Sequence, residues 1–202
     1  MKDRISKIML CFLAVSLVMI SGCGAKEEVK EQEEKLTLVN NAVYTAPTNP
    51  TNPQIKVYNE LSDAMNNNAA PEKVAELVAV NFAYEFFSLY QKTGKEDIGG
   101  LTFLPQDEVE NFKSYAMLHY YNNYATVVSQ YGEEDLPNVM MHEVTAVEST
   151  QIAYNQLVYD GYVVSLTLKY ADSKLPADGL KTTMHVQVCN IDGVYRVIAL
   201  ED

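Results

Sequence analysis

The sequence has few of the residues that mark disulfide-rich, metal-binding or nucleic-acid-binding proteins. Its 202 residues include three cysteines, three histidines and no tryptophan, with 15 basic against 27 acidic residues. A chain of net charge -12 has too little positive charge to neutralise nucleic-acid phosphates, which excludes nucleic acid as a partner. No spacing of Cys and His resembles a zinc site. We therefore expect neither a metal nor a cofactor.

Long apolar runs are also missing. The apolar segment Ile8–Ile20 is shorter than the ~20 residues that a membrane-spanning helix needs. It follows a basic start and precedes the small residues Ser21 and Gly22. A basic start, a short apolar segment and small residues at a cleavage site are together typical of a signal peptide for export.

Cys23 directly follows that small pair, and this arrangement resembles the signal of bacterial lipoproteins. The resemblance implies that residues 1–22 are removed and that the Cys23 thiol carries a lipid, with acyl chains such as palmitate. Two acyl chains anchor a protein stably, whereas one binds only marginally. We therefore expect a protein held on the extracytoplasmic face of the cell membrane, with Cys189 as its one free thiol.

Residues 23–53 predict an acidic tether followed by a proline-rich spacer. Gly24–Lys35 is a charged run with little to bury, which is typical of disorder. Residues 45–53 contain Thr-Asn-Pro twice, and proline fixes φ and disfavours helix in the residue before it. The folded domain is therefore expected over residues 54–202.

The first half of this domain has the periodicity of helices. Apolar residues recur at helical spacing from Val57 to Met65 and from Pro71 to Leu89, and Gly94 suits a helix C-terminus. A third apolar stripe runs from Pro105 to Gly132. The sequence therefore predicts three helices.

After Pro137 the period drops to two. Val139–Asn155 is expected as a long strand, residues 162–170 and 183–189 alternate apolar with polar, and residues 195–200 close the chain. The Asp192-Gly193 pair predicts a hairpin turn, whereas Asp160-Gly161 fits either a turn or a bulge. The fold class is therefore α+β, with N-terminal helices packed on a curved antiparallel sheet of about four strands.

This order of elements, with the closing run Asp-Gly-Val-Tyr-Arg-Val-Ile at residues 192–198, resembles the nuclear-transport-factor-2-like (cystatin-like cone) superfamily. The resemblance covers Pro71–Asp202 and implies a cone with a cavity between helices and sheet. The superfamily includes isomerases and dehydratases, and also many non-catalytic domains of bacterial envelope proteins, so the fold leaves the function open.

Histidine is the natural proton carrier near neutral pH, and the chain offers His119, His142 and His185. Glu143 follows His142, but adjacent residues of a strand point to opposite faces and do not pair. His185 alternates with the apolar residues of its strand and is expected on the outer face. We therefore assign no catalytic residue.

Tyrosine is frequent, with 14 residues, and six of them lie on the predicted second and third helices. Tyr120 and Tyr124 follow the apolar stripe of the third helix, as does Tyr131, and are expected in the core, whereas Tyr115 and Tyr121 are expected on the surface. Candidate cavity or contact residues are Tyr84, Tyr120, Tyr124 and His119.

Together these features predict a non-enzymatic binding or assembly module of the cell envelope. Its partner would be another envelope protein or a second copy of itself. The alternative is a small-molecule-binding protein or acid/base enzyme that uses the cone cavity. That alternative needs an open cavity with convergent polar groups. An interaction module can instead have the cavity filled by Phe82, Phe86 and Phe112.

Overall fold

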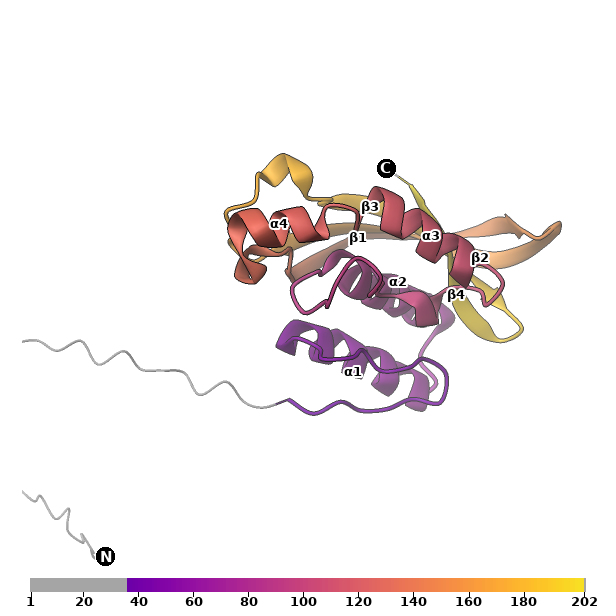
Figure 1. Cartoon of the computed structure of the whole chain (residues 1–202). Coiled ribbons are helices and arrows are strands. Elements are labelled where there is room, and N and C mark those ends of the chain that lie inside the picture. Colours follow the sequence, from indigo (N-terminus) through magenta and orange to yellow (C-terminus); the bar gives the residue numbers. More distant parts are fainter. Residues whose placement is uncertain (1–35, 202) are drawn as a thin grey trace, which may run out of the picture. The chain divides into compact units, whose positions relative to one another are not determined.

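The computed structural model describes residues 36–201 (Figure 1). The expected signal peptide, Cys23 and the charged run up to Lys35 lie outside the described residues. Within residues 36–201, no helix is both long enough and apolar enough to cross a membrane.

Four helices precede four strands, so the predicted α+β class is confirmed. The sheet is antiparallel throughout, has the order β1-β2-β3-β4 and is not closed. The elements are α1 (Asn52–Asn66), α2 (Pro71–Phe87), α3 (Val109–His119), α4 (Tyr124–Tyr131), β1 (Val139–Tyr154), β2 (Leu157–Tyr170), β3 (Thr183–Ile191) and β4 (Val194–Glu201).

Helix α2 is the centre of the fold. Every residue from Leu77 to Ser88 is buried, as expected for a helix that is apolar on all sides. Figure 1 shows α2 between α1 and the sheet, and it contacts all four strands. Pro71 lies in the first turn of α2, as predicted. Proline suits this position because the backbone N–H that it lacks would have no partner within the helix there. The helix ends well before Gly94, because Ser88 is extended and its hydroxyl accepts the N–H of Val139 at 3.1 Å.

The folded part begins earlier than residue 54. Tyr44 is buried in the core, where its hydroxyl donates to the Tyr195 carbonyl at 2.7 Å. Its own carbonyl accepts the hydroxyl of Tyr58 at 2.7 Å. Thr51 then caps α1 in a capping box with Gln54. The residues expected as a proline-rich spacer therefore lead from a core side chain directly into a helix.

The expected third helix is divided into α3 and α4, which corrects the prediction of one helix from Pro105 to Gly132. Between them Tyr121 is 0% exposed, and its hydroxyl donates to the Phe86 carbonyl at 2.6 Å. Tyr120 is 42% exposed and Tyr115 is 53% exposed. Tyr121, expected on the surface, is therefore buried. Tyr120, expected in the core, is partly exposed at its edge, with its ring 5.1 Å from that of Phe86.

The strand alternation is confirmed. Val164, Leu166 and Leu168 of β2 are buried, as are the alternate residues Met184, Val186 and Val188 of β3. These two rows form the sheet face that packs against α2.

The turns were predicted only in part. Asp192-Gly193 is a hairpin turn with both φ values positive, at 52° and 88°. Asp160-Gly161 is neither a turn nor a bulge, because it pairs in continuous register with Gln151 and Thr150. The β1–β2 turn is Asn155-Gln156, with φ of 49° and 65°, the backbone that a two-residue type I′ turn requires.

A tyrosine-lined groove as the candidate functional site

The β1–β2 hairpin is longer than the helix that covers it. At one end of α2, Ser88 binds Val139 at the start of β1. At the other end, Pro71 lies near Ser149, and β1 continues for five more residues beyond Ser149. A 17-residue helix spans about 25 Å, whereas 16 strand residues span about 50 Å. The outer part of the hairpin therefore projects past α2 (Figure 1).

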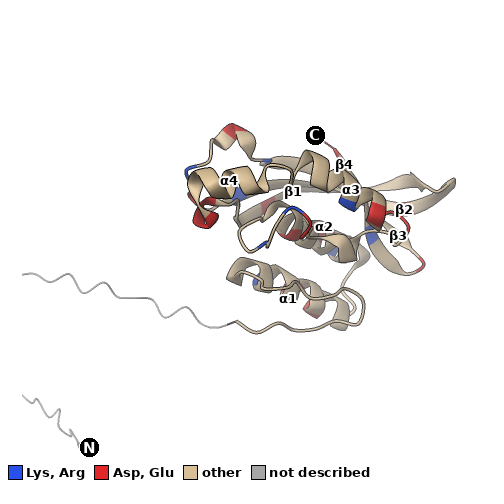
Figure 2. Cartoon of the chain, viewed as in Figure 1, with Lys and Arg blue, Asp and Glu red and all other residues tan. Residues whose placement is uncertain are grey.

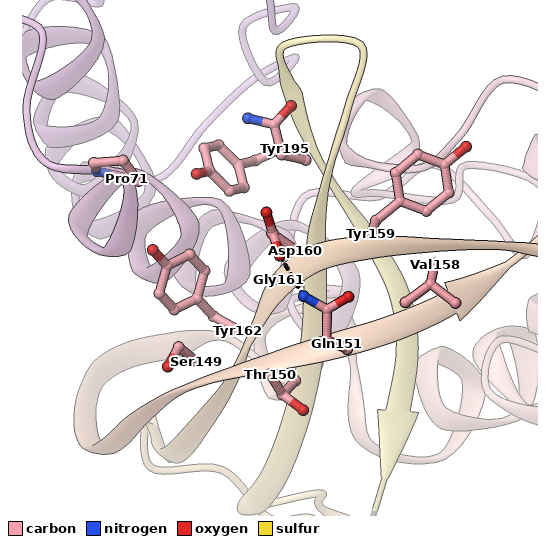
Figure 3. A pocket seen from close by; sticks show the side chains of 11 residues that line it. Pro71, Ser149, Thr150, Gln151, Val158, Tyr159, Asp160, Gly161, Tyr162 and Tyr195 are labelled. Atoms are coloured by element: carbon pink, nitrogen blue, oxygen red, sulfur yellow. Dashed lines mark hydrogen bonds between the residues drawn. The ribbon is translucent and has the colours of Figure 1, made fainter.

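A groove of about 870 Å³ lies where α2 no longer covers the β1–β2 hairpin (Figure 3). Ser149 is paired directly with Tyr162, and Gln151 with Asp160. Residues directly opposite each other on paired strands share a face of the sheet. Tyr162 precedes the buried residue Val164 in the same alternating row. Most of the groove is therefore the core face of the sheet, continued beyond the helix, and Thr150, Tyr159 and Gly161 of the alternate row also line it.

Tyrosine rings and amides form much of its wall. The rings of Tyr162 and Tyr195 lie 6.3 Å apart, centroid to centroid. The backbone carbonyl of Tyr195 accepts a hydrogen bond from the Tyr44 hydroxyl. The Gln151 side-chain amide donates to the Asp160 carboxylate across the strands (Figure 3). Desolvation raises the pKa of Tyr162, so its hydroxyl stays protonated and can donate or accept a hydrogen bond.

The groove offers acceptors and one carboxylate but no cation. None of its lining residues is basic, and the described Lys and Arg residues are distributed over separate helices, strands and loops (Figure 2). An anionic ligand would therefore meet the negative charges of Asp160 and of Glu72, both of which act on Tyr162. Neutral or cationic groups fit the site better.

The hairpin end beside the groove exposes apolar side chains. Leu157 is 59% exposed and Val158, which also lines the groove, is 64% exposed. The hairpin is braced by Asp107, whose carboxylate accepts the Tyr154 hydroxyl at 2.6 Å and the Asn155 amide at 2.7 Å. These two hydrogen bonds lower the pKa of Asp107 and keep it ionised. These hydrogen bonds connect the exposed end of the hairpin to the loop before α3.

The four candidate contact residues do not come together. Tyr84 is buried in α2, where its hydroxyl lies 3.1 Å from Nδ1 of His142, and burial raises its pKa to about 12. Tyr124 donates to the Lys92 carbonyl. His119 is exposed at the end of α3, with its ring 4.3 Å from that of Tyr115. None of these residues lines the groove.

The histidines are also separate. Burial lowers the pKa of His142, so its ring is neutral beside Tyr84. His185 is exposed on β3, with Nδ1 2.8 Å from the Ser165 hydroxyl. In neither contact does a carboxylate orient the ring.

Aromatic rings pack between α2 and α3. Phe82 and Phe86 stack at 5.5 Å, and Phe112 of α3 lies 5.9 Å from Phe82 and 5.1 Å from Phe86. Phe82 and Phe86 are fully buried. These rings fill only part of the space between helices and sheet, because Phe82 and Phe112 also line a pocket of about 320 Å³ between α3 and β4. The tyrosine groove lies outside this region.

The residues of the groove were not predicted as a site. Tyr159 and Tyr162 flank the pair Asp160-Gly161. Two tyrosines on either side of a polar pair within a strand are the one sequence feature that could have indicated a binding site here. That signal could not show that α2 stops short of these residues.

Over the range that the structure describes, no group of three or more His, Cys, Asp or Glu side chains could hold a metal ion. Comparison of the chain with models of protein families, with curated proteins and with solved structures gave no match. The function therefore has to be argued from the chain's own geometry.

Proposed function

We propose that this chain is a non-enzymatic binding module, anchored through Cys23 to the extracytoplasmic face of the cell membrane, that holds a segment of a partner envelope protein in the tyrosine groove. The observation that carries the proposal is the uncovered sheet face past Pro71, with Tyr162, Tyr195 and Asp160 in its wall.

The composition of the groove supports a polypeptide ligand. The lining includes Tyr, Ser, Asn and Gly, the residues enriched in the binding loops of antibodies. Tyrosine gives a large contact area at low entropic cost, and the small polar residues adapt their hydrogen bonds. The exposed Leu157 and Val158 add apolar area at one rim. The Asp160 carboxylate favours a neutral or basic segment of the partner.

The interior argues against the alternative of a small-molecule or enzyme site in a cone cavity. Phe82, Phe86 and Phe112 pack against one another there. The pocket of about 320 Å³ that Phe82 and Phe112 border is lined by apolar and tyrosine side chains, with no charged residue for acid/base chemistry. The order of four helices before an antiparallel sheet supports, as part of the same proposal, membership of the nuclear-transport-factor-2-like superfamily.

The test is site-specific photo-crosslinking in intact cells with the full chain. A photoreactive amino acid at Val158 should form an adduct with one other envelope protein, whereas the same group at the exposed Ser129 of α4 should not. The additional substitution Leu157→Ser, at an exposed position that leaves stability within about 0.5 kcal/mol, should reduce the adduct.

Equal adducts at Val158 and Ser129, or an adduct at Val158 that Leu157→Ser leaves unchanged, would contradict the proposal. An adduct of twice the mass of the chain would identify the occupant as a second copy and contradict the assignment to a different protein.

A further inference from the structure

A second groove lies along β4 and shares no lining residue with the tyrosine groove. It consists of two hollows of about 440 Å³ and about 320 Å³. Helix α3 and the segment before it form one wall, and β4 forms the other. We call it the β4 groove. The residues that line both hollows, and so make them parts of one groove, are Leu104, Phe112, Tyr115, Val197 and Ile198.

The wall formed by β4 is an edge of the sheet. β4 is the last strand in the order β1-β2-β3-β4 and pairs with β3 alone. The successive residues Val197–Leu200 all line the groove. Leu200 is paired with Val186 of the core face, whereas Ala199 is paired with Gln187 of the opposite face. Because residues of both faces line the same groove, the groove lies against the edge of the strand.

The backbone of this edge is open. Alternate residues of an edge strand direct their N–H and C=O groups away from the sheet. In the part of the chain that the structure describes, one backbone group of β4 has a partner outside the sheet, the Tyr195 carbonyl, which accepts the Tyr44 hydroxyl. Tyr195 lies before the residues that line the groove. The edge from Val197 to Leu200, about 13 Å long, is therefore free to pair with another strand.

The wall that faces this edge is aromatic. Phe112 and Tyr115 lie three positions apart in α3, and therefore on one face of the helix, and Tyr120 follows the helix. A strand placed between β4 and α3 can pair with the edge and pack side chains against these rings. A purely apolar small molecule fits less well, because it would cover backbone donors and acceptors without pairing them.

Both ends of the groove carry a carboxylate. Glu108 lines the end beside the start of α3, and Glu201 follows Leu200 at the other end. None of the residues that line the groove is basic. These charges favour a segment with basic residues beside an apolar centre. They disfavour a second copy of this chain, whose net charge is -12.

We propose that the β4 groove binds an extended segment of another protein, apolar at its centre and basic at its ends, which adds to the free edge of β4 as a fifth strand and packs against α3. Recognition by strand addition takes its affinity from main-chain hydrogen bonds and its specificity from pockets for alternate side chains. The proposal does not depend on the function proposed for the tyrosine groove.

The experiment is an NMR titration of the isotope-labelled full chain with the acetylated and amidated peptide Lys-Thr-Val-Ile-Val-Thr-Lys. The peptide should shift the amide resonances of Val197–Leu200 saturably and slow hydrogen exchange there. The same peptide, N-methylated at its three central residues, keeps the apolar side chains but loses backbone donors, and should bind about tenfold more weakly. A peptide with Glu in place of both Lys residues should also bind more weakly.

A pair of substitutions tests the aromatic wall. Tyr115→Ser removes a half-exposed ring from the groove and should weaken binding of the peptide about fivefold. The matched control is Tyr90→Ser, at a tyrosine that is 40% exposed and does not line the groove, and it should leave binding unchanged.

The proposal would be overturned by the absence of a saturable shift at Val197–Leu200, by equal binding of the N-methylated peptide, or by equal effects of the two substitutions. Shifts confined to Val158 and Tyr162 would place the peptide in the tyrosine groove and overturn it as well. Shifts at Val197–Leu200 that depend on the concentration of the chain alone would identify a second copy as the occupant and contradict the assignment to another protein. Equal binding of the peptide with Glu ends would overturn the preference for basic ends.

Discussion

Burial of the Glu85 carboxyl in α2 makes the stability of the fold depend on pH. Its carboxyl pKa rises from 4.5 to about 7 in the folded protein because burial disfavours the charge. Between these values the folded chain holds a proton that the unfolded chain has released, so the free energy of unfolding falls as pH rises. The full difference is on the order of 3 kcal/mol.

Urea denaturation of the wild type and Glu85→Gln at several pH values checks this prediction. The difference in unfolding free energy between the two proteins should change in favour of Glu85→Gln from about pH 4.5 to about pH 7 and stay level above it. A difference that is constant over this range would contradict the raised pKa.

Tyr121 shows why single side chains could not be placed from the pattern alone. Residues 120–123 read Tyr-Tyr-Asn-Asn, in which the asparagines are a weaker helix-end signal than proline or glycine. The helix breaks there because the Tyr121 ring enters the core and its hydroxyl reaches the Phe86 carbonyl. That bond joins residues 35 positions apart, and no local rule contains it.

At the scale of elements, the β1–β2 turn is a point of strain. Gln156 has φ of 65°, in the left-handed region that disfavours residues with a Cβ by about 1–2 kcal/mol. Gln156→Gly would give the Asn-Gly pair that this turn prefers. We expect it to stabilise the protein by about 1 kcal/mol, measured as a shift of the urea midpoint at unchanged slope.

The matched control is Gln130→Gly in α4, an exposed helical position where the same substitution should destabilise by about 1 kcal/mol. A loss of stability in Gln156→Gly would contradict the role of strain at the turn.

Strands were predicted more accurately than helices, for a physical reason. In β2 and β3 one face is buried, so the alternation of Val164, Leu166 and Leu168 with more polar residues fixes the pattern locally. The groove could not be predicted in this way. The groove arises because the end of α2 at Pro71 does not reach as far along the sheet as β1 and β2 do. Predicting it would require comparing the lengths of elements that are not adjacent in the chain.

At the scale of the whole molecule, attachment to the membrane depends on a residue outside the described range. The acyl chains proposed on Cys23 should hold the protein in the membrane fraction, since each buried methylene contributes about 0.8 kcal/mol. Cys23→Ala should therefore appear in the medium or accumulate unprocessed, as judged by cell fractionation. Retention of Cys23→Ala in the membrane fraction as a processed chain would contradict the lipid anchor.

The central claim is that the sheet face past Pro71 is covered by a partner outside the cell. Single cysteines at Val158 and Ser129 test it with a maleimide that cannot cross the membrane, since Cys189 is buried and gives little background. We expect both positions to react in the purified protein, and only Ser129→Cys to react rapidly in intact cells. Equal rates at the two positions in cells would show that the groove is empty, and no reaction at either would show that the domain is not on the outside.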